Sequence, residues 1–352
     1  MSIKEKVLIA MSGGVDSSLT AALLKHQGYD LIGLTMNLHE SINDEAINDA
    51  KKIADELNIP HYTVNFKDIF QKKVVDYFLQ EYSFGKTPNP CVACNKHIKF
   101  QALLDKAFSL GANYIATGHY ARVSYNDSAK NYELLKGIDK GKDQSYVLYN
   151  LTQEILKHVL LPLGEYTKEQ TRTMAKDLGL KIADKPDSQE ICFIPDNDYK
   201  KFFKEKMPNK LQKGNIVDKE GNKLGEHEGI SMFTIGQRKG LIAAGKPIYV
   251  TAINSTNNEV VVGDNEDLFS NSLIAQDVNF ISTEELRDQI EIEAKIRYSA
   301  KPALAKLFLL DNKKVQINFI EPQRAITPGQ AVVFYQGEKV LGGGTIETVN
   351  NI

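Results

Sequence analysis

Short apolar runs alternate with amphipathic stretches along the first third of the chain. Runs of strand length occupy residues 7–11, 30–38, 61–66 and 114–116, and apolar residues at helical spacing occupy 46–57, 68–82 and 98–107. Amphipathic helices between successive buried strands are typical of βαβ units. The pattern therefore predicts an α/β fold, a Rossmann-like doubly wound parallel sheet. Ligands of such sheets bind at the carboxyl ends of the strands, where Ser12, Met36 and Gly118 lie.

The pattern changes in the second half of the chain. Residues 123–138 resemble an exposed hairpin, and Thr167 and Gln170 have the capping-box spacing that begins a helix over 167–178. Short alternating segments at 291–298, 303–310, 314–320, 331–335 and 339–341 predict a small antiparallel β-barrel. We expect a catalytic domain over 1–200, a central glycine-rich domain over 201–270 and a C-terminal barrel over 271–352.

Composition narrows the class of protein. The chain has 352 residues, of which 42% are hydrophobic and 25% charged, as in globular proteins of two or three domains. No apolar run approaches the roughly 20 residues of a membrane span, so we expect a cytoplasmic protein without a membrane partner. The formal net charge of −2 means that any nucleic-acid binding must come from local patches. Residues 200–250 are such a patch, with ten lysines and one arginine against five acidic residues.

The segment from residue 7 to residue 18 predicts an anion site. An apolar strand leads into Ser12-Gly13-Gly14, and Asp16 and Ser17 open the next helix. Two glycines let successive backbone N–H groups point into one concavity, and the positive end of the helix dipole adds to their field. A carboxylate beside a phosphate site is repulsive unless a cation lies between them. Asp16 therefore suggests Mg²⁺.

This loop differs from the commoner phosphate-binding motifs. No lysine follows the glycines as in the Gly-x-x-x-x-Gly-Lys-Ser/Thr loop, and the spacing is not Gly-x-Gly-x-x-Gly. An ordinary tight turn is the structural alternative. The stretch instead resembles the pyrophosphate-binding loop of the N-type ATP pyrophosphatases, which split ATP between the α and β phosphates and adenylate a substrate oxygen.

Three cysteines carry the second chemical signal. Cys91 and Cys94 form a Cys-x-x-Cys arrangement at a predicted helix start, after two prolines that stiffen the loop, and Cys192 follows in a polar stretch. The odd number points to a reducing compartment. Zinc binding (with His97 nearby), a redox pair, an iron–sulfur cluster and persulfide chemistry all remain open, as does an inert structural role. We find no apolar anchor in Gln189 and Glu190, so we expect this loop to order only on binding its substrate.

Together these motifs closely resemble the bacterial and mitochondrial tRNA-specific 2-thiouridylases. The resemblance runs essentially from end to end and is carried by segments 10–17, 87–90, 94–96, 98–100, 116–120, 142–146, 191–194, 236–240, 297–298 and 327–330. It implies an adenine nucleotide α-hydrolase-like domain followed by two tRNA-binding domains. It also implies ATP and Mg²⁺ as cofactors, and tRNAs for Lys, Glu and Gln as substrates bound through the anticodon arm.

The resemblance implies a reaction sequence. AMP is transferred from ATP to the C2 oxygen of the wobble uridine, pyrophosphate leaves, and sulfur then replaces AMP to give 2-thiouridine. Cys192 matches the residue that carries sulfur as a persulfide, loaded by a cysteine desulfurase or a sulfur-relay protein. Cys94 matches the nucleophile that releases this sulfur through a Cys94–Cys192 disulfide.

Further residues match family positions with assigned roles. ATP-binding positions correspond to Ala10, Met11, Ser12, Gly13, Gly14, Val15, Asp16, Ser17, Met36 and Gly118. Positions that touch the target base correspond to Asn89, Pro90 and Cys91, and tRNA contacts correspond to Lys142, Asp143, Gln144, Arg297 and Tyr298. His119 and Gln330 match positions important for interaction with tRNA. Outside the family, Arg297-Tyr298 would be an ordinary strand pair and Lys142-Asp143 a solvated turn.

One departure keeps two sulfur routes open. Many family members carry aspartate where this chain has Cys91. A thiolate is a better iron ligand than a carboxylate, so Cys91, Cys94 and Cys192 could instead hold a 4Fe-4S cluster whose fourth iron binds sulfide. Two other functions remain as alternatives: an ATP pyrophosphatase like argininosuccinate or GMP synthetase, and a non-catalytic tRNA-binding protein with a degenerate loop.

Overall fold

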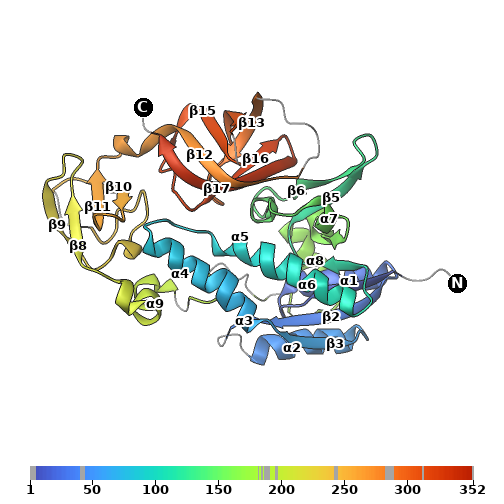
Figure 1. Cartoon of the computed structure of the whole chain (residues 1–352). Coiled ribbons are helices and arrows are strands. Elements are labelled where there is room, and N and C mark those ends of the chain that lie inside the picture. Colours follow the sequence, from blue (N-terminus) through green and yellow to red (C-terminus); the bar gives the residue numbers. More distant parts are fainter. Residues whose placement is uncertain are drawn as a thin grey trace.

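The structure, a computed structural model, describes residues 5–39, 44–180, 182–183, 185, 191–194, 197–241, 245–281, 289–310 and 313–350. The chain forms a parallel sheet with its helices, a small central sheet and a C-terminal barrel (Figure 1). The helices α4 (Asp76–Ser83) and α5 (Pro90–Cys94) run between the parallel sheet and the barrel in this view. The predicted fold class is confirmed.

The parallel sheet has five strands in the order β3-β2-β1-β4-β7. Their bounds are Lys6–Ala10 for β1, Asp30–Asn37 for β2, His61–Asn65 for β3, Tyr114–Ala116 for β4 and Val159–Leu160 for β7. The helices α1 (Val15–His26) and α2 (Asp44–Glu56) connect the first three strands. Because β1 is central, the turn that follows Ala10 lies at the middle of the carboxyl edge, as predicted.

Strand β1 is buried on both faces. Leu8 and Ala10 belong to one hydrophobic cluster, whereas Val7 and Ile9 belong to another that includes residues of α1 and α2. Alternate residues of a strand point to opposite faces, so this five-residue run packs against both layers of helices. The central position of β1 explains why the run is continuously apolar.

Two helical stretches contain π-helical turns. The first comprises α3 (Lys67–Phe70), a π-helix at Gln71–Val75 and α4, and the second comprises α5, a π-helix at Asn95–Ala102 and α6 (Leu103–Ser109). The second stretch begins at Pro90, because Pro at the first helical position needs no N–H partner. The helix predicted to carry residues 98–107 therefore also carries Cys91 and Cys94.

The central domain contains a four-stranded sheet that the sequence analysis did not predict. Its order is β10-β11-β8-β9, with bounds Gly214–Val217 for β8, Lys223–His227 for β9, Tyr249–Asn254 for β10 and Glu259–Gly263 for β11. Helix α9 (Tyr199–Lys206) precedes the sheet. Val250, Val260 and Val262 form its core with Ile216 and Phe233.

The C-terminal barrel closes through the pairing of β12 with β17. Strands β12 (Phe269–Phe280), β15 (Val315–Arg324), β14 (Ala303–Leu309), β13 (Gln289–Lys295), β16 (Ala331–Gln336) and β17 (Lys339–Asn350) follow one another around it. The predicted barrel is confirmed, although β17 is much longer than the predicted 339–341.

The predicted exposed hairpin is not free. Strands β5 (Ala121–Asn126) and β6 (Asn131–Lys136) pair as expected, but β6 also joins β17 through Leu135 and Lys339. The ion pairs Lys339–Glu133, at 3.0 Å, and Arg122–Glu338, at 2.7 Å, reinforce this edge. The hairpin therefore attaches the barrel to the N-terminal domain.

Candidate active site

The loop after β1 has the shape of an anion site. Gly13 adopts φ +71°, and a Cβ added there would lie 2.5 Å from the carbonyl oxygen of Ala46, so a larger residue does not fit. The backbone N–H of Ser12 donates to Ser17 Oγ at 3.2 Å, and the two serine hydroxyls lie 3.3 Å apart. Gly14 caps α1 without a side-chain hydrogen bond, which leaves this helix start open to a ligand.

Other predicted ATP-binding residues surround this loop in different ways. The side chains of Ala10, Met11 and Val15 are buried in the core, so only their backbone can face a nucleotide. Met36 is partly buried near the end of β2 and packs against two hydrophobic clusters. Gly118 packs against Asp16, where an added Cβ would lie 2.9 Å from the Cβ of that residue.

The carboxylate of Asp16 forms an ion pair with a lysine side chain of the protein itself. Lys168, at the start of α8 (Lys168–Asp177), donates from Nζ to both oxygens of Asp16 at 2.8 and 2.9 Å. The hydroxyl of Tyr120 donates to the same carboxylate at 2.8 Å. The sequence argument for magnesium assumed an unpaired carboxylate, and this premise is wrong. The arrangement does not fit a magnesium ion bound directly by Asp16.

A second lysine reaches the loop from the opposite side. Lys185 donates from Nζ to the carbonyl of Gly13 at 3.4 Å and to Asp49 at 3.0 Å. Arg172 on α8 holds that segment by donating to the carbonyls of Ala183 and Lys185. Helix α8 therefore supports the loop both directly, through Lys168, and indirectly, through Arg172.

The first two cysteines lie on α5, with Cys91 as its second residue and Cys94 as its last. Asn89 caps this helix, since its side-chain oxygen accepts from the N–H groups of Cys91 and Val92 at 3.1 and 3.3 Å. Cys91 is exposed, whereas Cys94 is buried. Burial raises the pKa of the Cys94 thiol to about 12, although the nearby charge of Lys99 lowers it. Cys94 is therefore protonated at neutral pH while its surroundings stay apolar.

Cys192 is exposed but its neighbours are anchored. Phe193 and Ile194 are buried in the same hydrophobic cluster as Cys94. The ring of Phe193 contacts those of Phe70 and Phe78 at centroid distances of 5.7 and 5.4 Å. Phe193 therefore anchors the segment on the C-terminal side of Cys192, while Gln189 and Glu190, on which the prediction for this loop rested, lie outside the described residues.

The three thiols are free, and they lie close enough for the charge of one to affect the pKa of another. Desolvation is the largest cause of the raised pKa of Cys94. The charge of Lys99 lowers this pKa, and the nearby thiols of Cys192 and Cys91 raise it further. Within the described part of the chain, no three cysteine, histidine or acidic side chains gather closely enough to hold a metal ion.

Several predicted tRNA contacts have partners inside the protein. Asp143 accepts hydrogen bonds from the N–H groups of Gly137 and Ser145 and from the hydroxyl of Ser145. Gln144 exchanges hydrogen bonds with the backbone of Tyr120, which precedes the hairpin. Lys142 lies in the same turn and is partly exposed. These contacts hold the turn beside Tyr120 and leave Lys142 at the surface.

His119 is buried and directly follows Gly118, which packs against Asp16. Its Nδ1 lies 2.7 Å from the hydroxyl of Thr117, and its ring is 5.7 Å from that of Phe100. Burial, with the charge of Lys99, holds its pKa well below 6.5, so the ring is neutral at physiological pH. With only 7% of the residue exposed, His119 contributes to the site mainly from within the domain.

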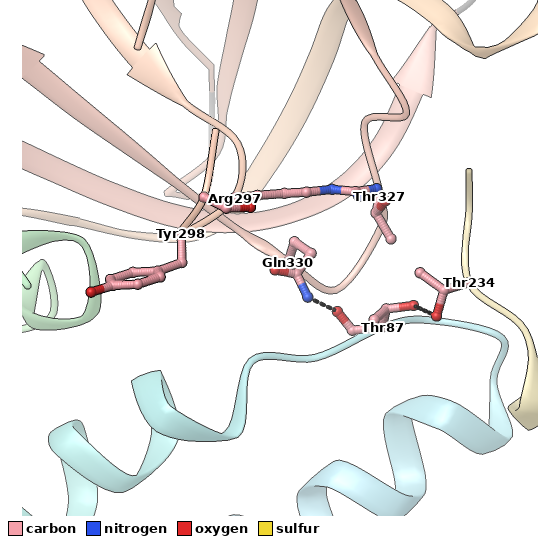
Figure 2. A pocket seen from close by; sticks show the side chains of 7 residues that line it. Thr87, Thr234, Arg297, Tyr298, Thr327 and Gln330 are labelled. Atoms are coloured by element: carbon pink, nitrogen blue, oxygen red, sulfur yellow. Dashed lines mark hydrogen bonds between the residues drawn. The ribbon is translucent and has the colours of Figure 1, made fainter. Parts of the chain in front are cut away.

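Thr87 is the point where the three domains meet (Figure 2). Its carbonyl accepts from Gln330 at 2.8 Å, and its hydroxyl donates to that of Thr234 at 3.1 Å. Arg297 donates to the carbonyls of Ile235 and Ala325 at 3.2 and 2.6 Å and to the hydroxyl of Thr327 at 2.5 Å. A cavity of about 240 Å³ lies between these residues. Arg297 and Gln330 therefore brace the junction, whatever they also contact.

Tyr298 points from this junction toward the N-terminal domain (Figure 2). It is 44% exposed, and its ring lies edge-on to buried Tyr146 at 6.0 Å. Lys295 lies over both rings, at 5.7 Å from Tyr146 and 5.4 Å from Tyr298. An exposed aromatic ring beside a lysine is a suitable stacking surface for an unpaired base.

Family models cover nearly the whole chain. A tRNA methyl transferase HUP domain matches residues 5–196, a tRNA methyl transferase PRC-barrel domain matches 200–264, and an aminomethyltransferase beta-barrel domain matches 270–346. The tRNA-specific 2-thiouridylase MnmA of Carboxydothermus hydrogenoformans is 56% identical over 98% of both chains. The chain belongs to the tRNA-specific 2-thiouridylase family.

A second 2-thiouridylase, that of Acetivibrio thermocellus, is 52% identical over 98% of this chain and 99% of its own. The predicted family is confirmed, and with it the class of enzyme. This membership sets aside the synthetase and non-catalytic alternatives. Among the described residues, no helix has the length and apolar character to cross a membrane.

The sequence analysis missed four residues that shape this 2-thiouridylase site: Tyr120, Lys168, Lys185 and Lys99. Only Lys168 had a readable signal. A lysine at the first position of a helix opposes the helix dipole and so calls for a carboxylate partner. Lys99 and Tyr120 lie in segments 98–100 and 116–120, which carry the family resemblance, but nothing local indicates their contacts. Lys185 lies in no such segment, and its partners Gly13 and Asp49 are far away in the sequence.

Proposed function

We propose that this chain converts the wobble uridine of tRNA to 2-thiouridine in the cytoplasm, using ATP and a persulfide on Cys192. The supporting observation is that a loop suited to bind phosphate and three free cysteines lie within one N-terminal domain. The serine hydroxyls and backbone N–H groups of residues 12–17 would bind the phosphates of ATP. Tyr298 and the basic stretch 200–250 would bind the anticodon arm of Lys, Glu and Gln tRNAs.

The first step makes the uridine oxygen a leaving group. The C2 oxygen attacks the α phosphorus of ATP, a new P–O bond forms, and pyrophosphate departs with the electrons of the broken α–β bond. N3 of the uridine gives up its proton to solvent in this step and regains a proton when the thiocarbonyl forms. Magnesium enters this step bound to the phosphates of ATP, and we assign it no side chain.

Sulfur then replaces AMP. The terminal sulfur of the Cys192 persulfide attacks C2, and AMP leaves with the oxygen. The Cys94 thiolate attacks Sγ of Cys192, so that the S–S bond to the transferred sulfur breaks and its electrons stay on that sulfur. A Cys94–Cys192 disulfide results, and an external dithiol reduces it. The persulfide comes from a cysteine desulfurase or relay protein.

The burial of Cys94 supports this division of roles between the thiols. An exposed cysteine such as Cys192 can be loaded by another protein, whereas the buried Cys94 is shielded from it. The raised pKa of Cys94 keeps it protonated until the substrate is in place, which limits premature attack on the persulfide.

Anaerobic thiolation of an unmodified glutamate-type tRNA tests this function. We expect wild-type protein with ATP, magnesium, a desulfurase and cysteine to form 2-thiouridine in the digested nucleosides. Cys192→Ala should lower the rate at least about a thousandfold, as expected when a covalent carrier is removed, without weakening ATP or tRNA binding. Retained activity in Cys192→Ala would contradict the persulfide role.

The variant Cys91→Asp separates the two sulfur routes. Aspartate occupies this position in many relatives, so the persulfide route predicts activity within about tenfold of wild type. The cluster route predicts weaker iron binding and less sulfide-dependent product in Cys91→Asp, because a carboxylate is a poorer iron ligand than a thiolate. The assay is run once with the desulfurase and cysteine and once with free sulfide as the sulfur source. ATP consumption without any 2-thiouridine from either source would contradict the proposed function itself.

A further inference from the structure

Lys168 occupies a position that its own helix disfavours. It is the first residue of α8, where the helix dipole is positive and a cation is unfavourable. Its side chain is only 11% exposed, although a lysine normally extends into water. Such a placement is costly unless a carboxylate compensates for the charge.

The compensating carboxylate is that of Asp16 in the phosphate loop. The ammonium contacts both Asp16 oxygens, and the phenol of Tyr120 supplies a third hydrogen bond. Lys168 also lies over the ring of Tyr120 at 5.6 Å. The three side chains come from α1, from the segment after β4 and from α8, so the triad is built from separate elements.

The backbone holds Lys168 in this position. Its N–H donates to Asp139 Oδ2 at 2.9 Å, and the preceding Thr167 forms a capping box with Gln170. Helices α1 and α8 pack against each other. On the other side, the backbone of Gly118 packs closely against Asp16, since a Cβ added at Gly118 would lie 2.9 Å from the Cβ of Asp16. The carboxylate is thus fixed beside the loop with its negative charge neutralised.

We propose that Lys168 is a positioning residue of the ATP site, which acts through Asp16. With Lys168 in place, the loop offers its N–H groups and hydroxyls to the triphosphate without a competing negative charge. Without it, the partly buried Asp16 carboxylate would repel the phosphates and loosen the first turn of α1. The inference rests on the proposed use of ATP and adds a residue to it.

Calorimetric titration of ATP, with EDTA and separately with magnesium, tests this role in the full chain. The variants are Lys168→Met, Asp16→Asn, the double variant and Lys168→Arg. Lys130→Met is the matched control, because Lys130 forms an exposed ion pair with Asp127 in the hairpin turn. Melting temperatures of all variants report whether each one folds.

In EDTA we expect Lys168→Met to weaken ATP binding roughly tenfold, because the partly buried Asp16 carboxylate keeps only the hydrogen bond from Tyr120 and its negative charge faces the phosphates uncompensated. Magnesium should reduce this loss. Adding Asp16→Asn to Lys168→Met should restore most of the affinity, since the repulsive charge is then gone, and Lys168→Arg should stay close to wild type. A purely structural lysine would lower the melting temperature without this rescue.

Two results would overturn the inference. The first is a Lys168→Met affinity equal to that of Lys130→Met in EDTA. The second is a double variant as weak as the product of the single losses. If the wild-type chain fails to bind ATP at all, the proposed function fails instead, so the two failures are distinguishable.

Discussion

The phosphate loop and the cysteine pair are held in place by opposite means. In the loop, charges and hydroxyls are paired: Asp16 with Lys168, Ser12 with Ser17, and Gly13 with Lys185. Around Cys94 and Cys192 the surroundings are mainly aromatic and aliphatic, and both thiols are free. Paired polar groups suit a site that must be ready to bind an anion. Apolar surroundings suit thiols that must stay unreactive until the substrate is in place.

The largest effect should come from the backbone of the loop. Gly13→Ala places a Cβ 2.5 Å from the Ala46 carbonyl, so the loop must move. We expect ATP affinity to fall about a hundredfold, since misplaced donors lose their phosphate contacts. The measurement is calorimetric titration of ATP with magnesium.

Gly111→Ala is the control for this substitution. Gly111 has the same φ of +71° but nothing within 4 Å of an added Cβ, so both variants carry the same backbone strain. Only Gly13→Ala should lose ATP affinity. Equal losses in the two variants would show that the shape of the loop does not decide binding, and the comparison drawn above would fail.

The apolar side of the comparison rests on Phe193. Phe193→Ala removes the ring that anchors the residue next to Cys192, at a cost of about 3 kcal/mol in stability. We expect thiolation to slow about tenfold because the two thiols lose their alignment, with ATP affinity unchanged. Product formation at saturating ATP measures the effect.

Phe202→Ala controls for the loss of a ring from the same cluster. Phe202 is 6% exposed and Phe193 is 7% exposed, but Phe202 lies on α9, away from Cys192 in the chain. Both variants should be destabilised alike, and only Phe193→Ala should slow sulfur transfer. A similar slowing in both would mean that the cluster acts through general stability.

The smallest expected effect concerns the buried ring of His119. Its pKa in the folded chain is well below 6.5, so below about pH 6.5 the unfolded chain binds a proton that the folded chain does not. The free energy of unfolding should therefore fall as the pH drops from 7.5 to 5.5. His119→Gln should remove at least about 1 kcal/mol of this fall.

Urea unfolding at several pH values measures this difference. His26→Gln is the matched control, because His26 is exposed at the end of α1. We expect its pH dependence to follow wild type. If His119→Gln kept the full pH dependence, burial of His119 would not be the source of the effect.

The sequence predicted the parts of this molecule whose causes are local. The apolar run 7–11, the glycine turn and the Thr167 capping box depend on neighbouring residues, and each appears where expected. The central sheet was missed because short strands such as Lys223–His227, which has one buried residue, contain glycine and lysine and show no alternation of apolar and polar residues. The side chains that neutralise Asp16 were missed because the contact depends on how α8 packs on α1.

The cysteine site shows the same limit. A cap and a proline at residues 89 and 90 are enough to place Cys91 and Cys94 on a helix start. The anchoring of Cys192 depends on Phe193 finding rings from three other helical segments, which no periodicity reports. Roles inferred from family resemblance, such as tRNA contact by Arg297, stay predictions beside its observed bonds at the junction.

The pairing of β6 with β17 limits how the domains of this chain can be separated in engineered proteins. The barrel is a separate fold, yet its sheet continues into a hairpin that belongs to the catalytic half. A barrel grafted onto another catalytic domain would lose this edge and the Arg122–Glu338 pair. A chain truncated before the barrel would leave the edge of β6 unpaired, so residues 121–136 need the barrel for their full set of contacts.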